Sequence, residues 1–276
     1  MSWITETAAL YDEIKEKVNN SDEWEPILPL YHSTSNAQIQ VTIFSDGTFS
    51  HAEVVDADDA KTIIPVTEDS SSRSSGIAPH PLCDKLIYIS GDYSTYVAKA
   101  KSNADEYFVT YIKALKAWAE SEYSDICITA IYDYLSKRML INDLIGDGIL
   151  KLKDAVLDEE YKITKSAKQI DSFVRFVVND LDSGENIKVW KSKALFDKYI
   201  AYYESLGKER DCQLCYASGK IVPVTYKHMA RIRNSGDSAK LISSNDESNF
   251  TYRGRFANRE EAFAVGEIVS QKAHLA

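Results

Sequence analysis

The sequence lacks any apolar run that approaches the roughly 20 residues of a membrane-spanning helix. It also lacks a signal peptide at its N-terminus, because Trp3, Leu10 and Val18 lie at helical spacing among acidic residues. These absences argue against a membrane protein and against a secreted one. We therefore expect a cytoplasmic protein with no membrane partner.

Cysteine is scarce, with only four in 276 residues, and this indicates no disulfide framework. Cys83 and Cys127 have apolar neighbours and are typical of small core residues. Cys212, Cys215 and His228 offer three potential zinc ligands, but zinc takes four, usually as two pairs. The alternative, which we favour, is a turn whose cysteines pack inward. We expect no metal and no cofactor.

Catalytic patterns are also missing. The chain has neither a Gly-x-x-x-x-Gly-Lys-Ser/Thr phosphate loop nor a Gly-x-Ser-x-Gly elbow. An acidic group after a predicted strand, Asp56, Asp58 and Asp59, is more typical of a solvated loop than of a magnesium site. None of the five histidines lies in a catalytic pattern. The sequence therefore predicts a protein that is not an enzyme.

A positive net charge is lacking as well, since the chain carries −10. This argues against general nucleic-acid binding, which requires Lys and Arg to neutralise phosphates. The average hides a basic segment: residues 208–259 hold ten Lys/Arg against five Asp/Glu, a net of +5, so that the rest carries −15. A basic surface on an acidic body suits a protein that contacts DNA at one place, although a chance cluster of solvated charges has the same composition.

Three short stretches are candidate DNA contacts. In the first, cations precede an Asn-Ser-Gly turn, so that Lys and Arg would hold phosphates and Asn234 would probe a base edge. In the second, small residues and Gly let the backbone approach a phosphate. In the third, two arginines flank a glycine on a predicted strand and project from one face. The candidates are Lys227, Arg231, Arg233, Asn234, Ser235 and Gly236; Arg73, Ser74, Ser75 and Gly76; and Arg253 and Arg255. For each stretch the alternative is an ordinary polar surface.

The fold class predicted is α+β, with a mixed, mainly antiparallel sheet, peripheral helices and a helical insertion near residues 95–150. Apolar residues make up 44% of the chain, enough to bury a sizeable core. Helical spacing predicts helices over residues 3–19, 95–120, 124–140 and 190–206. Strands are predicted at residues 39–43, 49–55, 63–66, 86–89 and 173–178, with Asp46-Gly47 as a hairpin turn and a loop at 67–76. Short strands follow Cys212. A last helix is predicted from Asn258 to the end of the chain, with Glu261 three residues after Asn258 as a capping box.

Four stretches, in order along the chain, carry a family resemblance. They are residues 74–84 (SSGIAPHPLCD), 173–176 (FVRF), 215–219 (CYASG) and 239–274, which includes NFTYRGRF and the helix after it. They resemble the large subunit of type I-C Cascade, the RNA-guided CRISPR surveillance complex, known as the Cas-eight-c or Csd-one family. The resemblance covers the N-terminal part of that family, and it implies that residues 1–276 form its N-terminal domain without the C-terminal helical bundle.

The resemblance implies a subunit that recognises the protospacer-adjacent motif (PAM) in double-stranded target DNA and helps to start strand separation. Protein then reads the PAM while guide pairing reads the target sequence. The implied partners are the guide-RNA-bearing subunits, which include the 5′-handle-binding and backbone subunits, the recruited helicase–nuclease and anti-CRISPR proteins. Two alternatives stay open: a protein-binding scaffold module without DNA reading, and a zinc-dependent nucleic-acid hydrolase that uses Cys212, Cys215 and His228.

Overall fold

The computed structural model describes residues 2–19, 27–71, 73, 76–165, 167–207, 212–226, 228–229, 241–242 and 264–276. The chain divides into two compact units. Unit 1 combines residues 1–32 with residues 203–276, and unit 2 is the continuous stretch 33–202. None of the helices described is both long and apolar enough to cross a membrane.

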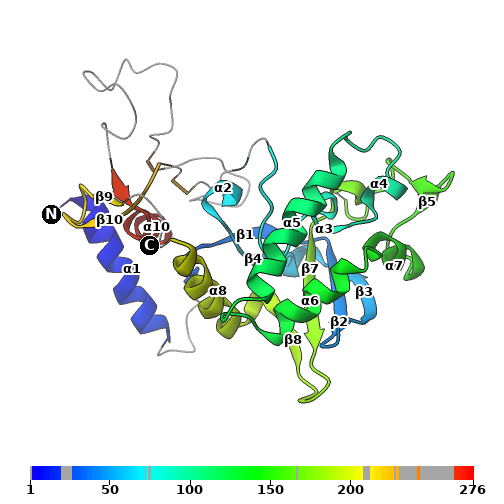
Figure 1. Ribbon diagram of the computed structural model, residues 1–276, viewed down its shortest axis with the longest axis horizontal. Coiled ribbons are helices and arrows are strands. Elements are labelled where there is room, and N and C mark those ends of the chain that lie inside the picture. The colour runs from blue at the N-terminus through cyan, green and yellow to red at the C-terminus, as the bar shows by residue number, and fades with distance from the viewer. Residues whose placement is uncertain are drawn as a thin grey trace. The chain divides into compact units, whose positions relative to one another are not determined.

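Unit 2 is built on a four-stranded mixed sheet in the order β3-β2-β7-β8 (Figure 1). β2 (Ile39–Phe44) and β3 (Phe49–Val54) form the predicted antiparallel hairpin, and Gly47 in its turn has φ +75°. β7 (Val174–Asn179) runs parallel to β2 and pairs on its other side with antiparallel β8 (Asn186–Lys188). The first five residues of β7 are buried, as its continuous apolar run predicts for a central strand.

Helices cover one face of this sheet. α6 (Ile126–Ser136) packs on β2 and β7, and α5 (Ala104–Ala119) packs on α6 (Figure 1). Gly47 fits closely beneath α6, where an added Cβ would lie 2.8 Å from the Cβ of Asp133. These helices and α7 (Leu140–Gly146) fall within the helical insertion predicted near residues 95–150.

The remaining elements of unit 2 are short. β1 (His32–Asn36) pairs with β4 (Lys61–Pro65), and β5 (Leu152–Lys153) pairs with β6 (Val156–Leu157). Single helical turns form α2 (Glu68–Ser71), α3 (Leu86–Ile89) and α4 (Tyr93–Tyr96), while η1 (Ala57–Asp59), η2 (Gln169–Asp171) and η3 (Val189–Lys191) are 3-10 turns. The long helix α8 (Lys193–Leu206) ends just inside unit 1.

Unit 1 joins the two ends of the chain. α1 (Trp3–Asn19) packs along α10 (Glu267–Leu275), and Asp12 on α1 forms an ion pair of 2.7 Å with Lys272 on α10 (Figure 1). Beside them lies a three-stranded sheet in the order β11-β10-β9, made of β9 (Cys212–Leu214), β10 (Ile221–Thr225) and β11 (Val265–Gly266).

The predicted α+β class is confirmed, and three local predictions are wrong. Residues 86–89 are a buried helical turn rather than a strand, because a short apolar run does not distinguish the two. The helix predicted over 95–120 starts only at Ala104. The last helix does not run unbroken from Asn258, since Val265 and Gly266 form a strand before α10 begins; Asn258 and Glu261 themselves lie outside the described residues.

Candidate nucleic-acid interface

The predicted loop at residues 67–76 begins as a turn of helix held by its own side chains. The backbone N–H of Thr67 donates to Ser70 Oγ at 2.9 Å, and the backbone N–H of Ser70 donates to Thr67 Oγ1 at 3.1 Å. This reciprocal pair is a capping box in which serine takes the place of Glu or Gln. It explains why a stretch with loop composition starts with the single turn α2.

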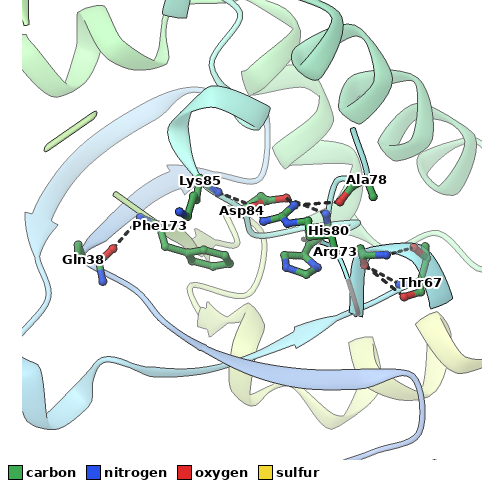
Figure 2. Close-up of polar contacts among 9 residues, drawn as sticks. Gln38, Thr67, Arg73, Ala78, His80, Asp84, Lys85 and Phe173 are labelled. Carbon is green, nitrogen blue, oxygen red and sulfur yellow. Dashed lines mark hydrogen bonds and ion pairs between the residues drawn. The ribbon is translucent and has the colours of Figure 1, made fainter. Parts of the chain in front are cut away.

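A buried ion pair closes the loop. The Arg73 guanidinium donates through Nη1 to Asp84 Oδ2 at 2.7 Å and through Nη2 to Asp84 Oδ1 at 2.6 Å. Nη1 also donates to the backbone oxygen of Ala78 at 2.9 Å. Figure 2 shows the Asp84 carboxylate between this guanidinium and the backbone N–H groups of His80 and Lys85, which each donate to it at 2.7 Å. We call this group the Arg73–Asp84 clamp.

The clamp is attached to the central sheet. The backbone oxygen of Asp84 accepts from Val174 N at 3.0 Å, where β7 begins. Phe173 N donates to the side chain of Gln38, which precedes β2, at 2.8 Å (Figure 2). The two parallel strands at the centre of unit 2 therefore position Asp84, and with it the clamp.

Charge and burial make this pair strong. Asp84 is fully buried and the Arg73 side chain is 16% exposed. Burial alone would lower the pKa of Arg73, but its hydrogen bonds to Asp84 raise that pKa above the ordinary value. The guanidinium also lies 4.3 Å from the centre of the Tyr88 ring, a cation–π distance. A bidentate pair that also satisfies two backbone donors holds Arg73 firmly to residues 78–85.

Among the described residues of this loop, Gly76 has an open backbone. It is exposed, its φ is +81°, and an added Cβ would meet nothing within 4 Å. The left-handed φ explains the glycine, since other residues adopt it at a cost. Another molecule can therefore approach the main chain here closely.

The predicted DNA contacts have different outcomes in the structure. Arg73, one of the predicted DNA-contact residues, is held in the clamp with both terminal nitrogens donating to Asp84, so its side chain has a structural role here. Of the other candidates only Gly76 is described; Ser74, Ser75, Lys227, Arg231, Arg233, Asn234, Ser235, Gly236, Arg253 and Arg255 lie outside the described residues. Their contacts with DNA stay predictions.

The Cys215 turn joins β9 to β10 in unit 1. Cys215 is buried, and its Sγ accepts from Gly266 N at 3.1 Å and from Ser218 N at 3.4 Å. Burial opposes ionisation of this thiol, yet these hydrogen bonds lower its pKa below the ordinary value. The sulfur thus accepts hydrogen bonds from the backbone and links the turn to β11.

The other two candidate zinc ligands do not join Cys215 in a cluster. Cys212 is exposed at the start of β9, and His228 Nδ1 lies 2.8 Å from Ser270 Oγ. Within the part of the chain that the structure describes, no three His, Cys, Asp or Glu residues are placed to hold a metal ion.

Sequence reasoning missed the role of Asp84. The signal was available, because an acidic residue flanked by Leu82, Cys83 and Leu86 is rarely buried without a cation partner. Arg73 is the nearest arginine upstream. Ala78, His80 and Asp84 lie in the 74–84 segment that carries the family resemblance, and all three take part in the clamp. This segment therefore has a structural role.

Comparison with known proteins identifies the family of the chain. No curated protein matches the chain. The family model described as CRISPR-associated protein (Cas_Csd1) matches residues 9–276, nearly the whole chain. The chain therefore belongs to the Csd1 family of CRISPR-associated proteins and is a Cascade subunit.

Proposed function

We propose that the chain is the PAM-recognising part of the large subunit of type I-C Cascade and helps to start strand separation in duplex target DNA. The observation that carries the proposal is the family match over residues 9–276. The clamped loop supports it, because an exposed glycine on an anchored loop suits close approach to DNA. The +5 charge of residues 208–259 supplies the phosphate contacts that the acidic remainder cannot.

In this proposal, positioning and reading belong to different residues. Lys227, Arg231 and Arg233 hold phosphates, which fixes register but carries no sequence information. Asn234 reads a base edge with its amide. The guide-RNA-bearing 5′-handle and backbone subunits hold the chain in the complex, and the helicase–nuclease and anti-CRISPR proteins are further partners. The chain itself performs no chemistry and works in the cytoplasm.

The test is the affinity of the assembled complex for matched duplexes that differ only at the PAM. Alanine at Lys227, Arg231 or Arg233 should weaken binding to every duplex alike and lower the salt slope by about one per lost contact. Asn234→Ala should lose roughly 1–3 kcal/mol on the correct PAM and little on a wrong one. If the wild-type complex binds good and bad PAMs equally when this chain is present, the proposal fails.

A protein-binding scaffold is the second candidate, and one observation favours it. The β9–β10 hairpin exposes three large apolar side chains: Leu214 is 51% exposed, Tyr216 57% and Ile221 75%. Leu214 and Ile221 are directly paired across the hairpin. Leu214→Ser with Ile221→Ser should release the chain from the complex if this surface binds another subunit, and should leave assembly unchanged if it does not.

A further inference from the structure

A cavity of about 490 Å³ lies within unit 2 beside the Arg73–Asp84 clamp, and Arg73, Gly76 and Lys85 line it. Its volume falls in the range of pockets that hold small ligands. The rest of its wall comes from α3, α4, the segment before α5, Tyr107 on α5, Glu159 after β6, and η2. All of these residues belong to one compact unit, so the cavity is a feature of unit 2 itself.

One part of the cavity wall is apolar and aromatic, and charged side chains make up the remainder. Tyr88 and Tyr107 meet edge to face with ring centres 4.9 Å apart, and the Arg73 guanidinium covers Tyr88. Ile87 and Ile170 are half-buried in the same wall. Such a surface suits the flat, apolar face of a nucleobase.

Cations form the rim. Lys85, Lys99 and Lys101 are exposed residues that line the cavity. Lys101 Nζ donates to Tyr107 Oη at 3.2 Å, which directs this charge toward the aromatic wall. Lys99 Nζ lies 3.7 Å from Glu159 Oε2, and the Lys99 side chain is 85% exposed. An ion pair this exposed is weak, so Lys99 can exchange Glu159 for a phosphate.

Two acids limit what the rim attracts. Glu159 and Asp171 also line the cavity, and Glu159 lies beside Lys99. Burial, followed by the charges of Asp171 and Glu159, raises the pKa of Tyr93 in the wall to about 12. Three lysines and two carboxylates leave a net charge of about +1, which suits one phosphate rather than several phosphates of a DNA strand. The carboxylate oxygens can also accept hydrogen bonds from the exocyclic amino groups of bases.

We propose that this cavity holds one unstacked nucleotide of single-stranded DNA, with its phosphate at the lysine rim and its base against the apolar wall. The inference rests on the proposed function, because strand separation beside the 73–76 loop supplies unpaired nucleotides next to the cavity. It adds a single-strand site to a chain otherwise proposed to read duplex DNA.

The test compares two charge-reversed pairs of lysines in the full chain, with a labelled ten-nucleotide single strand as the probe at low salt. K99E with K101E alters the rim of the cavity. K113E with K153E is the matched control, since both lysines are exposed, lie in the same unit outside the cavity wall and change the net charge equally. The rim variant should bind about 10-fold more weakly than the control, because it loses local phosphate contacts. Equal affinities of the two variants would overturn the proposal.

Two further measurements separate the base from the phosphate and guard against misfolding. A deoxynucleoside monophosphate should displace the single strand from wild-type chain at concentrations where inorganic phosphate does not; equal competition would reduce the cavity to a phosphate site. A wild-type chain irradiated with a 5-iodouracil-containing strand should crosslink within peptides that carry Tyr88 or Tyr107, and crosslinks confined to other peptides would contradict the assignment.

Failure of this inference is distinguishable from failure of the proposed function. The PAM preference of the wild-type complex tests the proposed function by itself. If that preference is present and the rim variant binds single strands as the control does, only the cavity proposal falls. If the preference is absent, the proposed function falls whatever the single-strand result.

Discussion

Two arginines of unit 2, Arg73 and Arg175, lie largely inside the protein. The guanidinium group of each pairs with a carboxylate and donates further hydrogen bonds to nearby oxygens. Arg175 on β7 is 2% exposed; it donates to Gln40 Oε1 at 3.0 Å and to the backbone oxygen of Asp59 at 2.6 Å, and stacks 3.8 Å from the Trp190 ring centre. Arg73 does the same work with Asp84. Removing one partner of such a pair leaves a buried charge without its counter-ion. Substitution of either partner should therefore destabilise the fold strongly.

Asp84→Asn should therefore destabilise unit 2 strongly. The substitution keeps the shape of the side chain but leaves the Arg73 guanidinium without its counter-ion, at a cost of roughly 3–5 kcal/mol. Urea unfolding of the full chain, followed by tryptophan fluorescence, measures it. Asp58→Asn, at an exposed position, is the control and should stay within about 0.5 kcal/mol of wild type. If both variants unfold at the same urea concentration, the clamp does not stabilise the unit.

The four cysteines should react with thiol reagents at very different rates. Burial raises the pKa of Cys83 and of Cys127 to about 12, so both are protonated and inaccessible at pH 8. Cys215 is also buried, and only Cys212 is exposed. We expect one fast-reacting thiol per native chain, measured with a chromogenic disulfide reagent, and four after unfolding. Cys212→Ser should abolish the fast reaction, whereas Cys215→Ser should leave it.

The candidate site shows what residue-level sequence reasoning can reach. It identified the loop that contains Arg73 and Gly76 from its Ser-rich composition. It assigned Arg73 to DNA and overlooked the apolar neighbours of Asp84, which indicate a buried carboxylate in need of a cation. The hydrogen bond from Val174 N that anchors Asp84 to β7 depends on the sheet and has no local signal in the sequence.

At the scale of single elements, α6 shows how a capping residue serves two purposes. The Asp125 carboxylate accepts from Cys127 N at 3.0 Å, which caps α6, and from Lys198 Nζ on α8 at 2.7 Å. Burial would raise the pKa of Asp125, but the hydrogen bonds from Lys198 and Cys127 outweigh it and lower the pKa. The same side chain therefore starts one helix and joins it to another.

Asp125→Asn and Asp125→Ala should separate these purposes. Asparagine keeps a capping oxygen, so it loses only the ion pair, whereas alanine should cost about 1 kcal/mol more for the cap. Because the folded pKa is lowered, the stabilisation by charge is present above the unfolded pKa of about 3.9 and is lost as pH falls through the folded pKa. Urea midpoints at pH 7 and pH 3.5 should show the wild-type advantage over Asp125→Asn shrinking at the lower pH. An advantage that does not change with pH would contradict this.

Element types were predictable where periodicity was long. The 17 residues of α1, the alternation in β2 and the hairpin turn that leads to β3 are strong patterns, and the structure confirms the elements they predict. The four residues Leu86–Ile89 are all apolar, so they show no periodicity that would distinguish a strand from a helix. Hydrogen bonds from Tyr88 N to Lys85 O and from Ser90 N to Leu86 O make this segment a helical turn. The strand at Val265–Gly266 was hidden within a helical pattern, because only pairing with Val224 and Thr225 makes it a strand.

At the scale of the whole molecule, the chain order differs from the spatial order. Residues 33–202 form a unit whose central sheet and covering helices are contiguous in sequence. Unit 1 is discontinuous: α1 comes from one end of the chain and α10 from the other. No local pattern predicts that residues more than 200 positions apart pack together, and this is why the sequence predicted the elements but not the two units.

This organisation predicts that the two units differ in their ability to fold alone. A fragment of residues 33–206, which keeps α8 whole, should unfold cooperatively in urea, because it contains its own core. A fragment of residues 203–276 should not unfold cooperatively, because it lacks α1 and Tyr31. In the whole chain, the Tyr31 N–H donates to Gln271 Oε1 at 2.7 Å, and Thr5 Oγ1 donates to the backbone oxygen of Ala217 at 2.9 Å. Amide hydrogen exchange on both fragments provides the measurement. Joining residues 1–32 to residues 203–276 through a flexible linker is the control and should restore protection in α10, since α1 then covers it again. Slow exchange in residues 203–276 without α1, or an unprotected β7 in residues 33–206, would show that the folding units are not those that the contacts define.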